Sequence, residues 1–316
     1  MSPKQPPRIS VIDPISPAIQ RVKDILFKPF DLGKWFTIGF CAWLAYLGCG
    51  GGSGGGGGGP HWNAFHKPHE QQAKIAEGVN SAKEYLLDNL CWIIPLIAIV
   101  AVVIIGIGLL IAWLNSRGKF MFLHCVATNK SEVKVPWHKF RKHGNSLFLF
   151  RMVLCIIGLA IVAVPILGIV LLIITMVTKT APYAASIPGI ILCGLIIFAL
   201  SISLSLVRKF TFDFVAPIMF LQTASCVAGW REFLTILSVN KARFALYILF
   251  QIVIAIAIGT IIFIGFCIGC CFCCASLLLF IPYIGTIILL PLFVFKRAYS
   301  LYYLRQFGPG FDVFGI

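Results

Sequence analysis

Charge is scarce in this sequence, and acidic residues are its rarest charged class. Lys and Arg number 26 and Asp and Glu only 11 among 316 residues, so 12% of the chain is charged, about half the share of a typical soluble domain. Hydrophobic residues make up 59% of the chain, and the mean hydropathy is +0.95. So few polar groups cannot cover this many apolar residues in water. The composition excludes a soluble enzyme, a disordered chain and a secreted disulfide scaffold.

The sequence also lacks recognisable motifs of enzyme chemistry. It has no H-E-x-x-H motif, and its glycine-rich run at residues 49–60 has no G-K-[ST] that would cradle a phosphate. No acidic residue lies in the middle of a long apolar stretch, where proton-coupled pumps commonly carry one. We therefore predict a protein that is not an enzyme and that has no cofactor.

Long stretches without charge are present instead. A helix that crosses the hydrocarbon layer needs about 20 consecutive apolar residues. The longest charge-free stretches cover residues 89–116, 152–178, 180–207 and 244–295. Because the last one is about twice the length of a single span, we expect two helices there, roughly Phe244–Ile268 and Ala275–Phe295. These stretches predict five membrane spans.

A shorter apolar segment, Trp35–Gly48, predicts a sixth span. Its 14 residues give a helix of about 21 Å, less than the roughly 30 Å of hydrocarbon. Counting it as a span places nearly all Lys and Arg residues, and both termini, on one side, as the positive-inside rule requires. The fold class predicted is all-α: a polytopic transmembrane helical bundle of about six spans whose net charge of +15 lies on the inner face.

The predicted organisation has four parts. Residues 1–34 form a cytoplasmic segment with an amphipathic helix over Ile15–Lys28, residues 35–48 the first span, residues 49–89 an outer glycine-rich linker and polar helix, and residues 90–316 the bundle with basic inner loops. The amphipathic helix lies either in the inner membrane interface or on the protein's own inner loops. The uncharged segment Phe214–Trp230 is too polar for a span, and we expect it to be re-entrant or to lie flat.

The two inner loops resemble each other. Trp137-x-x-Phe140 and Trp230-x-x-Phe233 both precede a long apolar stretch. This pattern indicates either a duplicated unit or simple anchoring of aromatic residues at the interface.

Basic residues of the inner loops are the candidate functional residues. Their simplest role is to orient the chain during insertion. A sharper hypothesis is contact with anionic lipid headgroups or with an acidic partner, at about 1 kcal/mol per residue. We expect no nucleic acid partner, and a protein partner or a homo-oligomer is left open. The candidates are Arg117, Lys119, Lys139, Arg141, Lys142, Arg208, Lys209 and Arg231. In addition, Asp213 is close enough to Arg208 and Lys209 to pair with one of them, and Lys296 and Arg297 are expected to cap the last helix.

Cysteines gather near the expected outer end of the fifth span. The cluster contains Cys267, Cys270, Cys271, Cys273 and Cys274. Its C-x-x-C spacing can bind zinc or form a redox pair, but cysteine is also a small apolar residue that packs well between helices. We predict packing, and therefore no metal site.

Three stretches resemble a family of bacterial multi-pass membrane proteins of unknown function. They are Ile25–Leu44, Arg117–Arg151 and Pro282–Phe314, whose boundary patterns are aromatic and basic. The resemblance implies a helical bundle in the bacterial inner membrane, with both termini cytoplasmic in the topology given above. More distantly, the pattern is similar to membrane domains that accompany some glycerophosphodiester phosphodiesterases, without their catalytic domain.

The leading functional hypothesis is a non-enzymatic scaffold or accessory subunit that acts through the basic inner surface on lipids or a partner. The alternative is a transporter or channel for a small or lipid-like solute, suggested by the repeated loops and by prolines within the apolar stretches.

Overall fold

The structure is a computed structural model that describes residues 9–48, 90–178, 183–271 and 281–315. All regular secondary structure in these residues is helical. The shorter helices are α1 (Ile15–Leu26), α2 (Leu32–Tyr46), α5 (Lys134–Lys139), α8 (Ala216–Gln222), α9 (Cys226–Val239), α11 (Pro282–Ile288) and α12 (Leu290–Arg305). The longer helices are α4 (Leu90–Thr128), α6 (Arg141–Val177), α7 (Tyr183–Phe210) and α10 (Lys241–Cys271). A π-helical turn, η1 (Thr211–Val215), joins α7 to α8, and two 3-10 turns, η3 (Pro309–Phe311) and η4 (Val313–Gly315), end the described chain.

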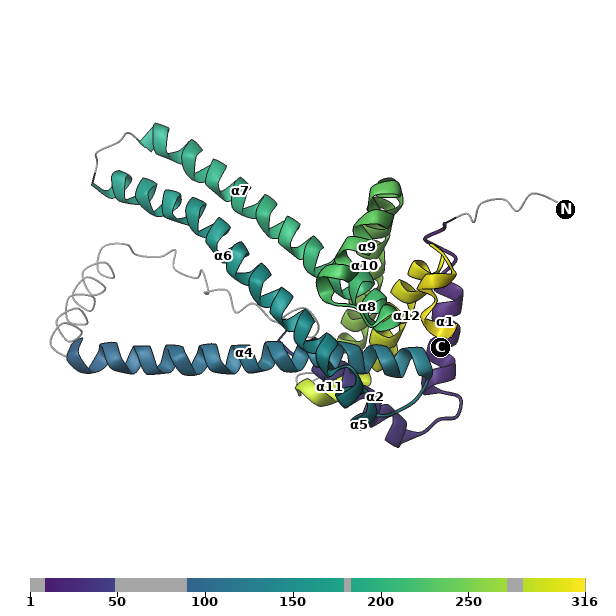
Figure 1. Cartoon of the computed structure of the whole chain (residues 1–316). Coiled ribbons are helices and arrows are strands. Elements are labelled where there is room, and N and C mark those ends of the chain that lie inside the picture. The colour runs from purple at the N-terminus through teal and green to yellow at the C-terminus, as the bar shows by residue number, and fades with distance from the viewer. Residues whose placement is uncertain (1–8, 49–89, 179–182, 272–280, 316) are drawn as a thin grey trace.

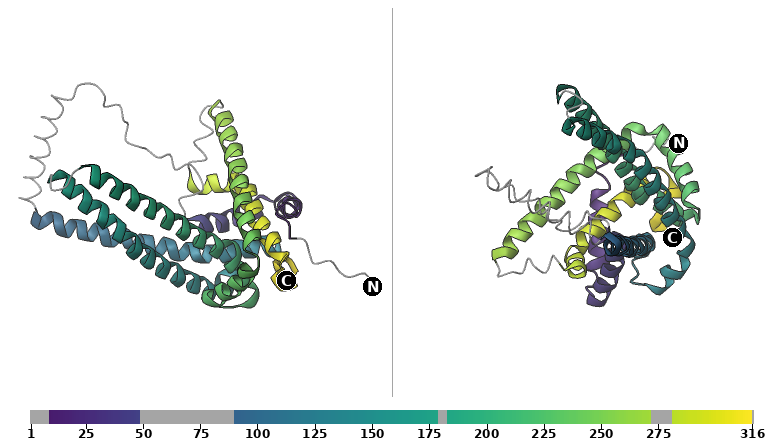
Figure 2. Two further views of the ribbon diagram at one scale, coloured as in Figure 1. Left: turned by 90° about the horizontal axis from the view of Figure 1, so that it is seen from above. Right: turned by 90° about the vertical axis from the view of Figure 1, so that its left-hand side faces the viewer.

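The long helices project from one compact part (Figure 1). We define the compact part as the shorter helices and 3-10 turns together with η1 and the ends of α4, α6, α7 and α10 that lie among them. In both Figures 1 and 2, α4, α6 and α7 leave the compact part in similar directions, whereas α10 leaves it in another. The expected loop and helix at residues 49–89 lie outside the described residues.

Four helical segments are long and apolar enough to cross a membrane. They are Cys91–Thr128, Arg141–Met176, Ser186–Gln222 and Lys241–Ile268, with mean hydropathy values between 2.7 and 3.2 over their most apolar windows. Within these most apolar windows the side chains are largely exposed rather than packed. Leu159, for example, is 71% exposed and Phe263 66%. Because such surface is unfavourable in water, these helices indicate a membrane protein.

Helix α4 divides into two halves with different surroundings. Every residue from 94 to 110 is exposed, whereas every residue from 115 to 127 is buried. Its 39 residues give a length of about 58 Å, roughly twice the hydrocarbon thickness. One half therefore has the length of a membrane span, and the other half forms part of the protein core.

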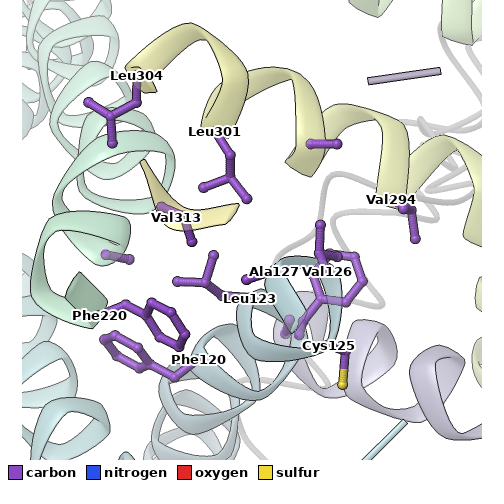
Figure 3. Packing of buried hydrophobic residues seen from close by; sticks show 14 of the residues in the cluster. Phe120, Leu123, Cys125, Val126, Ala127, Phe220, Val294, Leu301, Leu304 and Val313 are labelled. Carbon is purple, nitrogen blue, oxygen red and sulfur yellow. The ribbon is translucent and has the colours of Figure 1, made fainter. Parts of the chain in front are cut away.

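The core of the compact part is made of apolar side chains from helices that are far apart in sequence. Figure 3 shows Phe120, Leu123 and Val126 of α4 facing Leu301 and Leu304 of α12, with Phe220 of α8 and Val313 of η4 beside them. The labelled residues are at most 7% exposed. This core packs the second half of α4 against α12, although the two helices are far apart in sequence.

The predicted first span corresponds to α2, which is 15 residues long and is not among the four long helices. Ile38, Cys41 and Ala42 of α2 are fully buried, and α2 packs against α4 and α11. Asn115 of α4 donates its side-chain amide to the carbonyl oxygens of Ala45 and Leu47 at 2.7 and 2.8 Å. Those carbonyls at the end of α2 are thus satisfied by protein, as a helix C-terminus requires.

The predicted last span, Ala275–Phe295, falls partly outside the described residues. Its described portion forms α11 and the start of α12, and Leu290 and Val294 are buried in the core. The count of six spans is therefore not confirmed, since the described residues contain four helices of sufficient length.

Helix α1 occupies most of the segment expected to be amphipathic. Its residues Ala18, Val22, Ile25 and Leu26 are buried, and the helix packs against α12. Arg21 donates hydrogen bonds to the carbonyl oxygens of Val126 and Ala127 near the end of α4, where a cation complements the helix dipole. These contacts favour the alternative in which the helix packs on the protein itself.

Segment Phe214–Trp230 turns back within the compact part. It contains the end of η1, α8 and the start of α9, with the chain reversing at Thr223, which has a positive φ of 52°. Residues 213–220 are all buried. Its first part, up to Gln222, continues the long helical segment Ser186–Gln222.

We predict that Gly118→Ala destabilises the protein. A Cβ atom at Gly118 would lie 2.6 Å from backbone atoms of Leu44 and Ala45, so α2 must move away from α4. Such overpacking costs about 1–3 kcal/mol and lowers the thermal midpoint by about 5 °C in a chain of this size. Gly108→Ala on the same helix is the control, because nothing lies within 4 Å of its Cβ position. Thermal unfolding of both variants in mild detergent, followed by size-exclusion chromatography, makes the comparison, and equal midpoints would contradict this account of the α2–α4 contact.

Candidate functional site

A closed ring of polar side chains lies at the end of α7 and the first turns of α10. We call it the polar ring, and it consists of Lys209, Asp213, Tyr247 and Gln251. Lys209 Nζ is 2.9 Å from Asp213 Oδ2, which also accepts a hydrogen bond from the Tyr247 hydroxyl at 3.1 Å. Gln251 donates to the Tyr247 oxygen at 2.9 Å and accepts from Lys209 at 3.4 Å. Each member therefore contacts two others.

Helical spacing and the π-helical turn place these groups. Lys209 with Asp213, and Tyr247 with Gln251, are four residues apart, so each pair lies on one helical face. Asp213 belongs to η1, and π-helical turns are frequent at functional sites. The expected pairing of Asp213 with Arg208 or Lys209 is confirmed for Lys209.

Arg297 lies beside the polar ring, in the interior of α12. It is 1% exposed, and its Nη1 donates to the Phe212 carbonyl oxygen at 2.7 Å. Its guanidinium carbon is 4.4 Å from the centre of the Phe212 ring, and Lys119 Nζ is 4.8 Å from the same centre. Burial lowers the pKa of Arg297, and the Asp213 carboxylate opposes that change. Burial and the charge of Lys209 likewise lower the pKa of Lys296, again against Asp213.

The prediction that Lys296 and Arg297 cap the last helix is wrong, because α12 runs on to Arg305. The prediction assumed that the helix ends where its apolar stretch ends. In the structure the helix leaves its apolar stretch and continues through the core.

A second polar arrangement surrounds Arg117 of α4. Its guanidinium carbon is 4.2 Å from the Trp113 ring centre and 4.9 Å from the Trp137 ring centre. Arg117 Nη2 and Trp113 Nε1 both donate to Asn145 Oδ1, each at 3.2 Å. We call these four residues the Arg117 site; it joins α4 to α5 and to the start of α6.

The predicted basic residues divide into two groups. One group is exposed and consists of Lys139, Arg141, Lys142, Arg208 and Arg231. The other group lies in the interior or partly so, and consists of Arg117, Lys119 and Lys209. The structure thus separates basic residues that are exposed, including Lys139 over the Phe140 ring, from those that are buried or paired with Asp213.

The predicted cysteine cluster is only partly described. Cys267 is exposed on α10, Cys270 and Cys271 lie in the last turn of α10, and Cys273 and Cys274 are outside the described residues. Among the residues that the structure describes, no group of three or more His, Cys, Asp or Glu residues could hold a metal.

Sequence reasoning missed a pair of buried cysteines. The Cys41 and Cys125 sulfur atoms are 3.9 Å apart, between α2 and α4. The hydrogen bond with Cys125 and burial raise the pKa of the Cys41 thiol, so it is a poor nucleophile. The two residues are 84 positions apart, and no local spacing signals such a pair.

Comparison with known proteins gives one family. A family model described as a family of unknown function (DUF7544) matches residues 9–283. No curated protein and no solved structure matches the chain.

We predict that Asp213→Asn destabilises the protein strongly. Lys209 loses its ion pair, and the neighbouring Arg297 loses the carboxylate whose charge opposes the cost of its burial. Breaking a buried ion pair costs about 3 kcal/mol. The control is Glu232→Gln, because Glu232 accepts only an exposed hydrogen bond from Gln222 and surface changes cost within about 0.5 kcal/mol. Thermal midpoints in one detergent provide the measurement; equal midpoints for Asp213→Asn and wild type would show that the polar ring does not stabilise the fold.

Proposed function

The chain belongs to the DUF7544 family, whose function is unknown, and we propose that it is a non-enzymatic integral membrane protein, a scaffold or accessory subunit, whose compact part binds anionic lipid headgroups. The observation that carries this proposal is the position of an exposed basic patch relative to the apolar half of α4. We define the basic patch as Lys139, Arg141 and Lys142 at the junction of α5 and α6.

Two tryptophans mark the apolar half of α4. Trp92 is 81% exposed, and Trp113 follows 21 residues later. That separation is about 32 Å along the helix, close to the roughly 30 Å of hydrocarbon. Tryptophan is enriched at both interfaces of a membrane. The pair therefore supports an inner interface at the level of Trp113.

The basic patch lies next to this level. Trp113 contacts Trp137 of α5, with ring centres 6.0 Å apart, and the patch begins two residues after Trp137. All three of its residues are exposed. Each basic residue near an anionic surface contributes about 1 kcal/mol of attraction. Among possible ligands, anionic headgroups are the ones that this depth favours.

The alternative, a transporter or channel, is supported by the repeated loops: Trp137 and Phe140 lie at α5 before α6, and Trp230 and Phe233 in α9 before α10. A transport pathway also needs polar groups along the apolar stretches. There, however, the hydroxyls of Ser201, Ser203 and Thr260 donate to carbonyl oxygens of their own helices, four residues earlier. Such bonds satisfy the hydroxyls within the helix, and we therefore rank transport second.

The proposed location is the bacterial inner membrane, with both termini cytoplasmic. The location rests on the resemblance described above, and the orientation on the positive-inside rule. Ser10 and Gln306 exchange two hydrogen bonds of 2.7 and 2.9 Å, and this contact between the two ends of the described chain supports placing them on one side of the membrane. A protein partner and a homo-oligomer are both compatible with this arrangement.

We predict that replacing two lysines of the basic patch weakens the binding of anionic lipid. In the double variant Lys139→Gln, Lys142→Gln, the loss of about 2 kcal/mol corresponds to about thirtyfold weaker binding of phosphatidylglycerol. Native mass spectrometry of the full chain, delipidated and then titrated with phosphatidylglycerol or with phosphatidylcholine, measures it. The control Lys139→Arg, Lys142→Arg keeps the charge and should bind as wild type does. Equal binding of the two lipids by the wild type would refute the proposed function.

A further inference from the structure

Arg117 is a buried cation that lacks part of its hydrogen bonding. It is 7% exposed, and its Nε has no partner in the described part of the chain. The two flanking tryptophan rings hold the guanidinium by cation–π contacts, which attract its charge but accept no hydrogen bond from its edge. Gly144 makes room for it, since a Cβ there would lie 2.9 Å from Arg117 Cγ. The surrounding residues are therefore shaped around a guanidinium whose donors are not all used.

The charge at this position is also unbalanced. Arg141 precedes Asn145 by four residues in α6, so it lies on the helical face that contacts Arg117, and its charge has the same sign. The two ion pairs within the described residues are Lys209 with Asp213 and Arg305 with Asp312, so neither arginine is paired with a carboxylate there. Two cations close together, one of them buried, are unfavourable unless an anion joins them.

The neighbouring polar group adds a donor. Asn145 is exposed, and its Oδ1 accepts from both Arg117 and Trp113. Its amide nitrogen donates no hydrogen bond within the described residues and is left for a ligand at the surface. Because Arg117, Arg141 and Asn145 thus offer donors and positive charge, the ligand that fits is an anion rich in acceptor oxygens. A phosphate group has this chemistry, and arginine matches its geometry well.

The depth of Arg117 agrees with a lipid phosphate. Arg117 follows Trp113 by four residues, which is about 6 Å along α4. A bilayer of 40–45 Å with about 30 Å of hydrocarbon leaves roughly 5–7 Å for the headgroup region on each side. If Trp113 marks the edge of the hydrocarbon, Arg117 lies at the level of the phosphates.

We propose that Arg117, Arg141 and Asn145 bind the phosphate group of one membrane phospholipid, with Trp113 and Trp137 holding the Arg117 guanidinium in place. This inference rests on the proposed function, which it narrows from an attractive surface to a defined site. The basic patch supplies attraction that needs only charge, whereas the Arg117 site needs a guanidinium.

The test separates these two requirements with Arg117→Lys, which keeps the charge and loses the fork of donors and the stacking surface. Titration of the delipidated full chain with phosphatidylglycerol, followed by native mass spectrometry, should show the first bound lipid weakened about tenfold, the effect of losing one good charged hydrogen bond. Arg243→Lys is the matched control, because Arg243 is exposed and contacts no tryptophan ring in the described structure. If Arg117→Lys does not fold, Asn145→Ala provides a second variant, with a smaller loss expected.

A second arm uses inorganic phosphate as the probe. Millimolar phosphate should leave the thermal midpoint of the delipidated wild type unchanged, because the proposed ligand needs its acyl chains in the membrane. If inorganic phosphate raises the midpoint of the wild type and not of Arg117→Lys, the site takes a free anion and the lipid assignment is wrong.

The outcomes also separate this site from the proposed function. Weakened binding in the Lys139→Gln, Lys142→Gln variant together with unchanged binding in Arg117→Lys would overturn the Arg117 site and leave the basic patch standing. Unchanged binding in both variants would overturn both.

Discussion

The exposed apolar side chains of α4, α6, α7 and α10 impose the constraint on which the rest of the structure depends. Their backbone groups are hydrogen-bonded within the helices, so hydrocarbon can surround these helices without leaving polar groups unsatisfied, whereas water is unfavourable for the exposed apolar side chains. In α4 this exposure ends at Asn115, from which the helix is buried to Ala127. The compact part is therefore built around the ends of helices whose other halves require lipid, and its polar groups gather where the environment changes.

The polar ring lies where α10 joins the rest of the protein. Helix α10 leaves the compact part in a different direction from α4, α6 and α7, and its first turns lie in the compact part (Figure 2). Those turns contain Tyr247 and Gln251, which bind Lys209 and Asp213 at the end of α7. Phe244 adds contacts with Phe214 and Phe233 at 5.2 and 5.4 Å. The ring and these aromatic contacts thus join α10 to the rest of the protein.

The long helices could be predicted from the sequence because a gap between charges needs no knowledge of tertiary contacts. The prediction of long apolar helices over residues 91–114, 152–178, 180–207 and 244–268 is confirmed in outline. The segment Trp35–Gly48 shows the limit, since hydropathy does not distinguish an apolar residue that faces lipid from one that faces another helix. In α2, Ile38 and Cys41 are buried in the core, whereas Phe36 is 49% exposed. The Lys209–Asp213 pair could be predicted because the two residues are four positions apart on a helix. The contacts of Arg117 with Trp137 and of Tyr247 with Asp213 were not, because nothing local links residues that far apart.

The structure also shows that the basic residues differ in their burial. The positive-inside rule counts every lysine and arginine alike, yet here Arg117 and Arg297 lie against aromatic rings with little exposure, while Lys139 and Lys142 are exposed. Removing a buried cation takes a packed side chain and its cation–π contacts from the core, so we expect the main cost in the free energy of unfolding. Removing an exposed one leaves the core intact and reduces only the attraction to an anionic surface. Positive charge therefore contributes to the core where it is buried and to attraction for an anionic surface where it is exposed, and the proposed site at Arg117 combines the two.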